Sequence, residues 1–131
     1  MNQTKQIHYK AIFKQDGDQQ TVEYKAKGYI CYGQKTNLYF QTSQGKIQIS
    51  YDDKEVHLKN GDSLLRFHKE KMVWNQYQLP YGMVELKTEL MKFQSGDDVL
   101  KMKYALYDHQ GLISTVYIMV TFKDEIIGED A

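Results

Sequence analysis

The hexapeptide Tyr77-Gln78-Leu79-Pro80-Tyr81-Gly82 holds the only proline of this chain, and strand-like sequence flanks it on both sides. Proline has no backbone N–H group, so it is excluded from the paired positions of a central strand. Pro80 therefore marks an edge, a corner or the start of a strand. Because the other breaks in the sequence are short turns rich in glycine and aspartate, the chain is predicted to be almost entirely β-structure.

Apolar and polar residues alternate with a period of two on both sides of this corner, which is typical of strands with one buried face. The most regular alternation is in residues 83–90, although the glutamate, lysine and leucine there would also suit a helix. The alternation favours a strand. Turns such as Asp16-Gly17 and Asn60-Gly61 carry the residues that tight hairpins require. The predicted strands are residues 7–13, 22–32, 37–42, 46–51, 55–59, 63–68, 72–77, 83–93, 99–107 and 112–122.

The short spacing of these strands decides how they are arranged. Parallel neighbours need connections of about a dozen residues, usually helical, and the turns here are too short for them. A long antiparallel meander exposes unpaired edges unless it closes. The sequence therefore predicts one all-β domain over residues 1–131, a closed antiparallel up-and-down barrel of about 8–10 strands. Gly28, inside a long run, is expected to form a bulge or a sharp bend, and the acidic segment 124–131 is expected to fray.

The charge balance of the chain argues against several classes of partner. Among 131 residues, 17 are basic and 17 are acidic, whereas proteins that bind nucleic-acid backbones usually have a basic excess. The first residues lack the apolar stretch of a secretory signal, and the chain has no apolar run of about 18 residues. Cys31 is the only cysteine, so an intramolecular disulfide cannot form. We expect a cytoplasmic protein with neither nucleic-acid nor membrane partners.

Residues that could perform catalysis or bind a metal are scattered along the sequence. The four histidines show no metal-binding spacing, although a hairpin could bring His57 near His68. A G-x-S-x-G nucleophile elbow, a phosphate-binding loop and a dinucleotide fingerprint are all missing from the sequence. The sequence thus predicts a protein without enzymatic activity, cofactor or metal.

The hexapeptide around Pro80, followed by Thr88, resembles the Y-x-x-P-Y-G…T signature of the YwiB-like family of Gram-positive bacteria. The long run with Gly28, the hairpin at Lys59-Asn60-Gly61 and the final two-strand ribbon are also similar, so the resemblance covers nearly the whole chain. It implies a calycin-type, lipocalin-like closed barrel in a small cytoplasmic protein, without a defined biochemical activity. The positions that the family marks, without individual roles, are Tyr77, Pro80, Tyr81, Gly82 and Thr88.

A barrel of this size either fills its interior with side chains or holds one small ligand, and the sequence leaves both open. Aromatic residues of inward parity and a few polar residues would line that space, and the Pro80 corner would shape one end. The candidate ligand-binding residues, in the interior or at the mouth, are Tyr24, Phe40, Trp74, Gln76, Tyr81, Thr88 and Tyr104. The leading hypothesis is a non-enzymatic barrel that binds a small, partly apolar molecule there.

The alternative hypothesis is a protein-interaction module with a solid core. Its partner would dock on exposed strands rich in tyrosine, a residue that is enriched at protein interfaces. Tyr29, Tyr39 and Tyr117 have the outward parity that this role requires. Self-association into a homodimer is one version of this alternative.

Overall fold

The computed structural model describes residues 2–124, and this part of the chain forms ten β-strands and no helix. Apart from Asp124, the predicted acidic tail lies outside the described residues. None of the described segments is a helix with the length and apolar character needed to cross a membrane. In chain order the strands are β1 (Asn2–Gln15), β2 (Asp18–Cys31), β3 (Thr36–Thr42), β4 (Gly45–Tyr51), β5 (Glu55–Asn60), β6 (Ser63–His68), β7 (Val73–Leu79), β8 (Gly82–Ser95), β9 (Val99–Asp108) and β10 (Gly111–Asp124).

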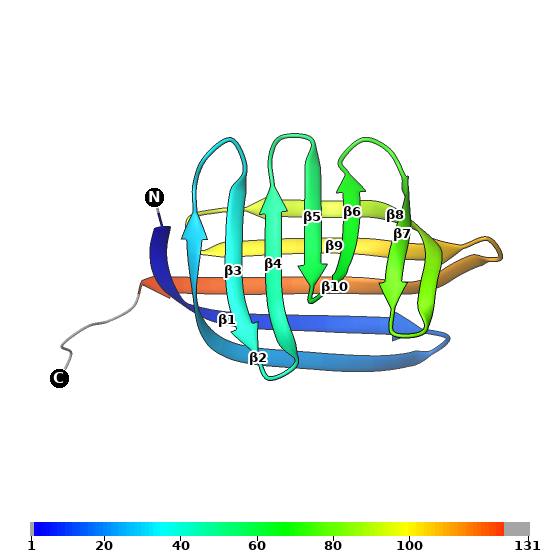
Figure 1. Cartoon of the computed structure of the whole chain (residues 1–131), viewed down its shortest axis with the longest axis horizontal. Coiled ribbons are helices and arrows are strands. Elements are labelled where there is room, and N and C mark those ends of the chain that lie inside the picture. Colours follow the sequence, from blue (N-terminus) through cyan, green and yellow to red (C-terminus); the bar gives the residue numbers. More distant parts are fainter. Residues whose placement is uncertain (1, 125–131) are drawn as a thin grey trace.

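These strands form one antiparallel sheet that rolls into a nearly closed barrel of two crossed layers. Figure 1 shows β3 to β7 running vertically in front, and β1, β2, β8, β9 and β10 running horizontally behind them. The order across the sheet is β6-β5-β4-β3-β2-β1-β10-β9-β8-β7. Neighbours in that order are consecutive in the chain except for β1 and β10, so short turns suffice for the connections. The predicted all-β, antiparallel up-and-down fold is confirmed.

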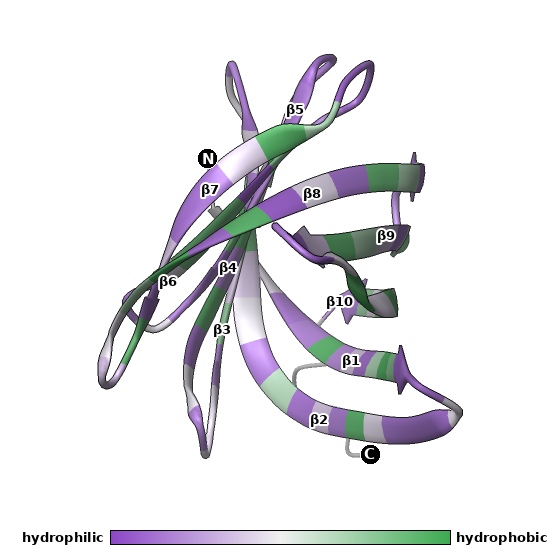
Figure 2. Cartoon of the chain, turned by 90° about the vertical axis from the view of Figure 1, so that its right-hand side faces the viewer, coloured by the Kyte–Doolittle hydropathy of each residue, from purple (hydrophilic) through white to green (hydrophobic). Residues whose placement is uncertain are grey.

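The inward faces of both layers form one apolar core. Buried and exposed residues alternate along the strands, and Figure 2 shows hydrophobic residues as green bands and hydrophilic residues as purple bands on the ribbons. Burial of the inward side chains removes apolar surface from water, which is the main favourable term in folding. The bulkiest of the almost fully buried side chains include Phe67, Phe122, Ile30, Leu38, Ile49, Leu100, Met102 and Ile118.

The long strand β2 belongs to both layers, and it curves from the back layer into the front layer (Figure 1). It pairs with β1 from Asp18 to Cys31 without a register shift, but it pairs with β3 only from Gly28 to Cys31. Gly28 is therefore the first residue of β2 that pairs with the front layer. The unbroken register with β1 excludes a bulge at Gly28, and the curve of β2 in Figure 1 is consistent with the predicted bend. Irregular register occurs instead in β8 and in β10.

The turn between β7 and β8 consists of Pro80 and Tyr81, and Leu79 and Gly82 form the last pair of the ladder before it. Gly82 has a φ of 142°, a conformation that residues with a side chain rarely adopt. A proline fits in this turn because its missing N–H is not needed for a ladder hydrogen bond. Pro80 thus marks the end of a strand, as the sequence predicts.

Within residues 2–124, the barrel closes along a seam between β6 and β7, which lie side by side without a backbone ladder. Side chains bridge this seam. The Arg66 N–H donates to Oδ1 of Asn75 (2.7 Å), and Nδ2 of Asn75 donates to the Arg66 carbonyl (3.1 Å), so this amide replaces a neighbouring peptide group. Thr88 donates to the same carbonyl (2.6 Å), and Ser63 donates to the Gln78 carbonyl (2.6 Å).

Candidate ligand site inside the barrel

Four tyrosine side chains from four different strands gather inside the barrel, and we call them the tyrosine cluster. They are Tyr9 on β1, Tyr24 on β2, Tyr77 on β7 and Tyr104 on β9. Tyr9 and Tyr24 lie opposite each other in the β1–β2 ladder, and their rings stack with centroids 6.0 Å apart. Tyr104 lies close enough to Tyr9 and Tyr77 for the phenol groups to influence each other electrostatically.

Phenylalanine rings form an apolar wall beside the tyrosine cluster. The Phe40 ring on β3 lies 5.5 Å from the Tyr9 ring, and the Phe67 ring on β6 lies 4.6 Å from the Tyr104 ring, both in tilted arrangements. Tilted aromatic pairs at these separations are favourable because the edge of one ring meets the face of the other. The site therefore combines apolar rings from the front layer with phenol groups from the back layer and from β7.

No hydrogen bond within the described chain involves a hydroxyl group of the tyrosine cluster, and this includes the hydroxyls of Tyr9 and Tyr104. Both side chains are deeply buried, with only 7% and 3% of their surface exposed. Among the described residues, every fully enclosed polar side-chain atom does have a partner. These two hydroxyls must therefore border space that a molecule the size of water can reach.

Burial keeps these phenols protonated. It raises the pKa of Tyr9 to about 12, and the nearby Tyr24 adds to the shift. Burial also raises the pKa of Tyr104 well above the usual value for a phenol, with smaller contributions from Tyr9 and Tyr77. At neutral pH both groups are uncharged and can donate a hydrogen bond. The site thus offers neutral donors next to apolar rings.

These raised pKa values predict that the folded protein loses stability in alkali. Between pH 10 and the raised pKa, the unfolded chain releases protons that the folded chain retains, so the free energy of unfolding falls as pH rises. Below pH 10 the two phenols contribute their full share to the free energy of unfolding. Above pH 10 we expect the free energy of unfolding to fall by roughly 1.4 kcal/mol per pH unit for each of Tyr9 and Tyr104. Urea unfolding at pH 9, 10 and 11 measures this slope, and Tyr9→Phe should reduce it. Ionisation of all eleven tyrosines near pH 10 in the folded protein would contradict the prediction.

Four of the seven predicted site residues face the interior. Tyr24, Phe40 and Tyr104 pack in or against the core, and Thr88 is fully buried. The Thr88 hydroxyl already donates to the Arg66 carbonyl across the seam, so it is committed to closing the barrel. Tyr24, Phe40 and Tyr104 therefore belong to the interior site, whereas Thr88 belongs to the seam between β6 and β7.

The predicted inward parity of β7 is wrong. Trp74 is 48% exposed and Gln76 is also exposed, whereas Asn75 is buried. The reason is the seam: the polar residue that faces inward on β7 is the one that bonds the backbone of β6. Tyr81, which is 84% exposed in the β7–β8 turn, lies outside the interior as well, and its predicted place at the mouth stays a prediction.

On the outer face, Trp74 takes part in a different set of contacts. Its ring stacks on His109 with centroids 4.5 Å apart, and the Lys87 amino group lies 5.4 Å from the Trp74 ring. Nε2 of His109 lies 2.8 Å from Glu85. These contacts cover part of the indole surface, which explains how a tryptophan is accommodated on the solvent side.

The sequence pattern did not single out four residues of the interior site or its seam, namely Tyr9, Tyr77, Phe67 and Asn75. The alternation of β1 placed Tyr9 on the same face as Ile7, and this was a usable signal. Asn75 carried no comparable signal, because its hydrogen bonds are made to β6, and the local sequence pattern does not show that β6 and β7 are neighbours.

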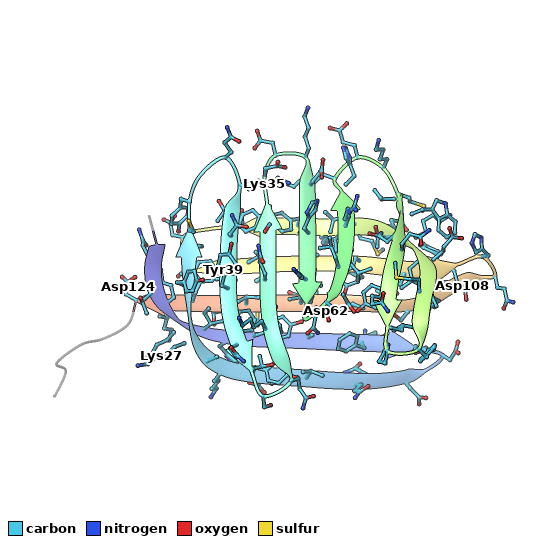
Figure 3. All side chains as sticks on the ribbon, in the orientation of Figure 1. Lys27, Lys35, Tyr39, Asp62, Asp108 and Asp124 are labelled. Carbon is cyan, nitrogen blue, oxygen red and sulfur yellow. The ribbon has the colours of Figure 1, made fainter. Side chains whose placement is uncertain are left out.

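The outer surface also has a groove of about 670 Å³ near the start of the β2–β3 ladder. Its lining includes Lys27, Tyr39 and Asp62, which Figure 3 labels on β2, on β3 and at the β5–β6 turn. Tyr29 and Tyr39, two of the predicted outward tyrosines, stack there with centroids 4.8 Å apart. This groove is open to solvent, whereas the side chains of Tyr9 and Tyr104 are buried in the interior.

The described part of the chain has no group of three or more histidine, cysteine, aspartate or glutamate residues that could hold a metal ion. His57 lies opposite Arg66 in the β5–β6 ladder, and His68 lies opposite Glu55, so the hairpin does not pair the two histidines.

Comparisons with known proteins are consistent with this barrel. A crystal structure of the YwiB protein from Bacillus subtilis is similar, with a TM-score of 0.68, 21% sequence identity and 93% of each chain covered. At this level of identity the likeness shows the fold, and the wider relation to calycin barrels stays a prediction. A search of curated proteins found no match. The model of a domain of unknown function, DUF1934, matches residues 7–120, which span nearly the whole sheet. The chain therefore belongs to the DUF1934 family, as its resemblance to YwiB-like proteins implies.

Proposed function

We propose that this protein binds a small, uncharged and partly apolar molecule in the barrel, with a hydrogen-bond acceptor of the ligand directed at the tyrosine cluster. The observation that carries this proposal is the pair of hydroxyls on two deeply buried tyrosines, Tyr9 and Tyr104, which lack a partner in the described chain but are not fully enclosed. Each of these hydroxyls can donate a hydrogen bond to a ligand acceptor or to a water molecule.

The charge of the interior supports an uncharged ligand. Lys5 is the buried lysine of inward parity, and its amino group is already paired with Asp124 at 2.6 Å. An ionised ligand beside the tyrosine cluster would lose its hydration without gaining a counter-charge, which is expensive in an apolar environment. A ketone, ether or alcohol oxygen would instead accept a hydrogen bond from a neutral phenol. The apolar part of such a ligand would contact Phe40 and Phe67.

A fluorescent dye with a naphthyl ketone tests this proposal, because its emission reports an apolar environment and its carbonyl can accept a hydrogen bond. We expect saturable uptake by the wild-type protein. Tyr104→Phe keeps the ring and removes the hydroxyl, so it should weaken dye binding by roughly 2- to 10-fold, the value of one neutral hydrogen bond. Native mass spectrometry of freshly purified protein would reveal a molecule that co-purifies and competes with the dye.

The matched control is Tyr107→Phe. The Tyr107 hydroxyl donates to Glu89 at 2.7 Å on the outer face, so its removal should leave dye affinity unchanged. The proposal would be contradicted by no saturable uptake together with no added mass. Equal dye affinities of the wild type and Tyr104→Phe would contradict the role assigned to the hydroxyl.

A further inference from the structure

The strand β2 has a free edge over much of its length. It pairs with β1 throughout, but its other edge pairs with β3 only from Gly28 to Cys31. From Asp18 to Ala26, no backbone hydrogen bond from another described segment reaches that edge. Figure 1 shows this part of β2 at the lower border of the barrel. A free strand edge is a template for pairing with another strand.

The hairpin that joins β1 to β2 determines which backbone groups face the free edge. Its turn consists of Asp16 and Gly17, both with positive φ, so Gln15 and Asp18 form a hydrogen-bonded pair. Hydrogen-bonded pairs recur at every second residue, so Val22 and Tyr24 also bond to β1. The N–H and C=O groups of the alternate residues point toward the free edge; these residues are Gln19, Thr21, Glu23 and Lys25.

This edge lacks several of the features that prevent pairing. Edge strands are usually protected by a proline, a bulge, an inward charge or charged side chains such as lysine. Between Asp18 and Ala26 there is no proline, and the register with β1 has no shift. The charged side chains near its middle, Glu23 and Lys25, point outward and have opposite signs. Opposite charges two residues apart favour antiparallel pairing of this edge with the same edge of a second chain.

We propose that two copies of this chain pair in an antiparallel manner through the free edge of β2, with Tyr24 of both copies at the two-fold axis. This register places Glu23 of each copy opposite Lys25 of the other, and Val22 opposite Ala26. In this register the backbone groups that point toward the free edge face each other, so Glu23 of one copy and Lys25 of the other form a hydrogen-bonded pair. Centring the pairing on Glu23 or on Lys25 would place like charges opposite each other, which is unfavourable.

The proposed dimer also places two copies of the interior site near each other. Tyr24 packs on Tyr9 within the tyrosine cluster (centroids 6.0 Å apart), and it would face its own copy across the axis. The dimer rests on the free edge and on the Glu23–Lys25 pattern, so it stands independently of the proposed ligand.

Sedimentation velocity of the full chain, over a roughly hundredfold range of concentration, tests this dimer. Wild-type protein should dimerise reversibly. Glu23→Lys and Lys25→Glu should each weaken the dimer by roughly tenfold, because each places two pairs of like charges across the interface. An equimolar mixture of the two variants should form a heterodimer, since both cross-strand pairs are then complementary. The double variant Glu23→Lys/Lys25→Glu should restore self-association.

Two further variants separate the interface from general charge effects and from loss of fold. Lys92→Glu makes the same charge change as Lys25→Glu, but at an exposed position of β8, and it should leave the dimer intact. Thr21→Pro removes an edge-facing N–H without disturbing the ladder to β1, so it should abolish dimerisation while circular dichroism remains that of the folded barrel. A monomer at all concentrations would overturn the proposal, as would a dimer that persists in both Glu23→Lys and Thr21→Pro.

Discussion

Gly28→Ala is expected to destabilise the protein by roughly 3 kcal/mol or more, at the upper end of the usual cost of overpacking. A Cβ atom at this position would overlap the Tyr39 carbonyl oxygen and Cδ1 of Ile7, and it would lie 2.8 Å from Cβ of Phe40. The carbonyl belongs to the adjacent strand, and both side chains are buried in the core. None of these atoms can move away without breaking the β2–β3 ladder or shifting the core.

Urea unfolding followed by circular dichroism measures this loss of stability. The matched control is Gly33→Ala, because a Cβ atom there would meet only the Lys35 carbonyl oxygen, at 3.7 Å. We expect the control to be neutral or slightly stabilising, since alanine restricts the unfolded chain more than glycine does. Similar unfolding midpoints for the two variants would show that the bend of β2 does not require glycine.

Asn75→Ala is the second change with a large expected effect, roughly 3 kcal/mol of lost stability. The substitution removes both hydrogen bonds that the Asn75 amide makes to the Arg66 backbone. Thr88 would still donate to the Arg66 carbonyl, but the Arg66 N–H would lose its partner. Because the ladder is missing between β6 and β7, opening of the barrel should begin at this seam.

Hydrogen exchange measured by mass spectrometry can locate the effect of Asn75→Ala. We expect faster exchange in β6 and β7, with β1 and β10 unchanged. Gln76→Ala is the control, because Gln76 is exposed on the same strand and its side chain has only a 3.5 Å contact with Glu85. Asn75→Asp keeps the acceptor for the Arg66 N–H and loses the donor, so it should also destabilise the protein at neutral pH. Equal stabilities of Asn75→Ala and Gln76→Ala would mean that the amide does not hold the seam.

The prediction of which residues face the interior was correct where strand parity was clear. Tyr24 and Tyr104 lie in long runs of regular alternation, so the side that faces the core follows from their apolar neighbours. It failed for β7, where the alternation is weak and the parity shared by Trp74 and Gln76 was assigned to the interior. The actual inward residue, Asn75, is polar, and it satisfies a backbone that belongs to a different hairpin.

Local pattern was enough to establish the antiparallel strands and their short turns, because alternation and turn chemistry act between residues close in the chain. The position of the seam, the convergence of four phenols and the free edge of β2 came only from the folded arrangement. They depend on which strands meet after the sheet has curved, and that is set by contacts between distant segments such as β1 with β10 and β6 with β7. A period-two pattern indicates which side chains of a strand face the core, but it does not indicate which strands become neighbours when the barrel closes.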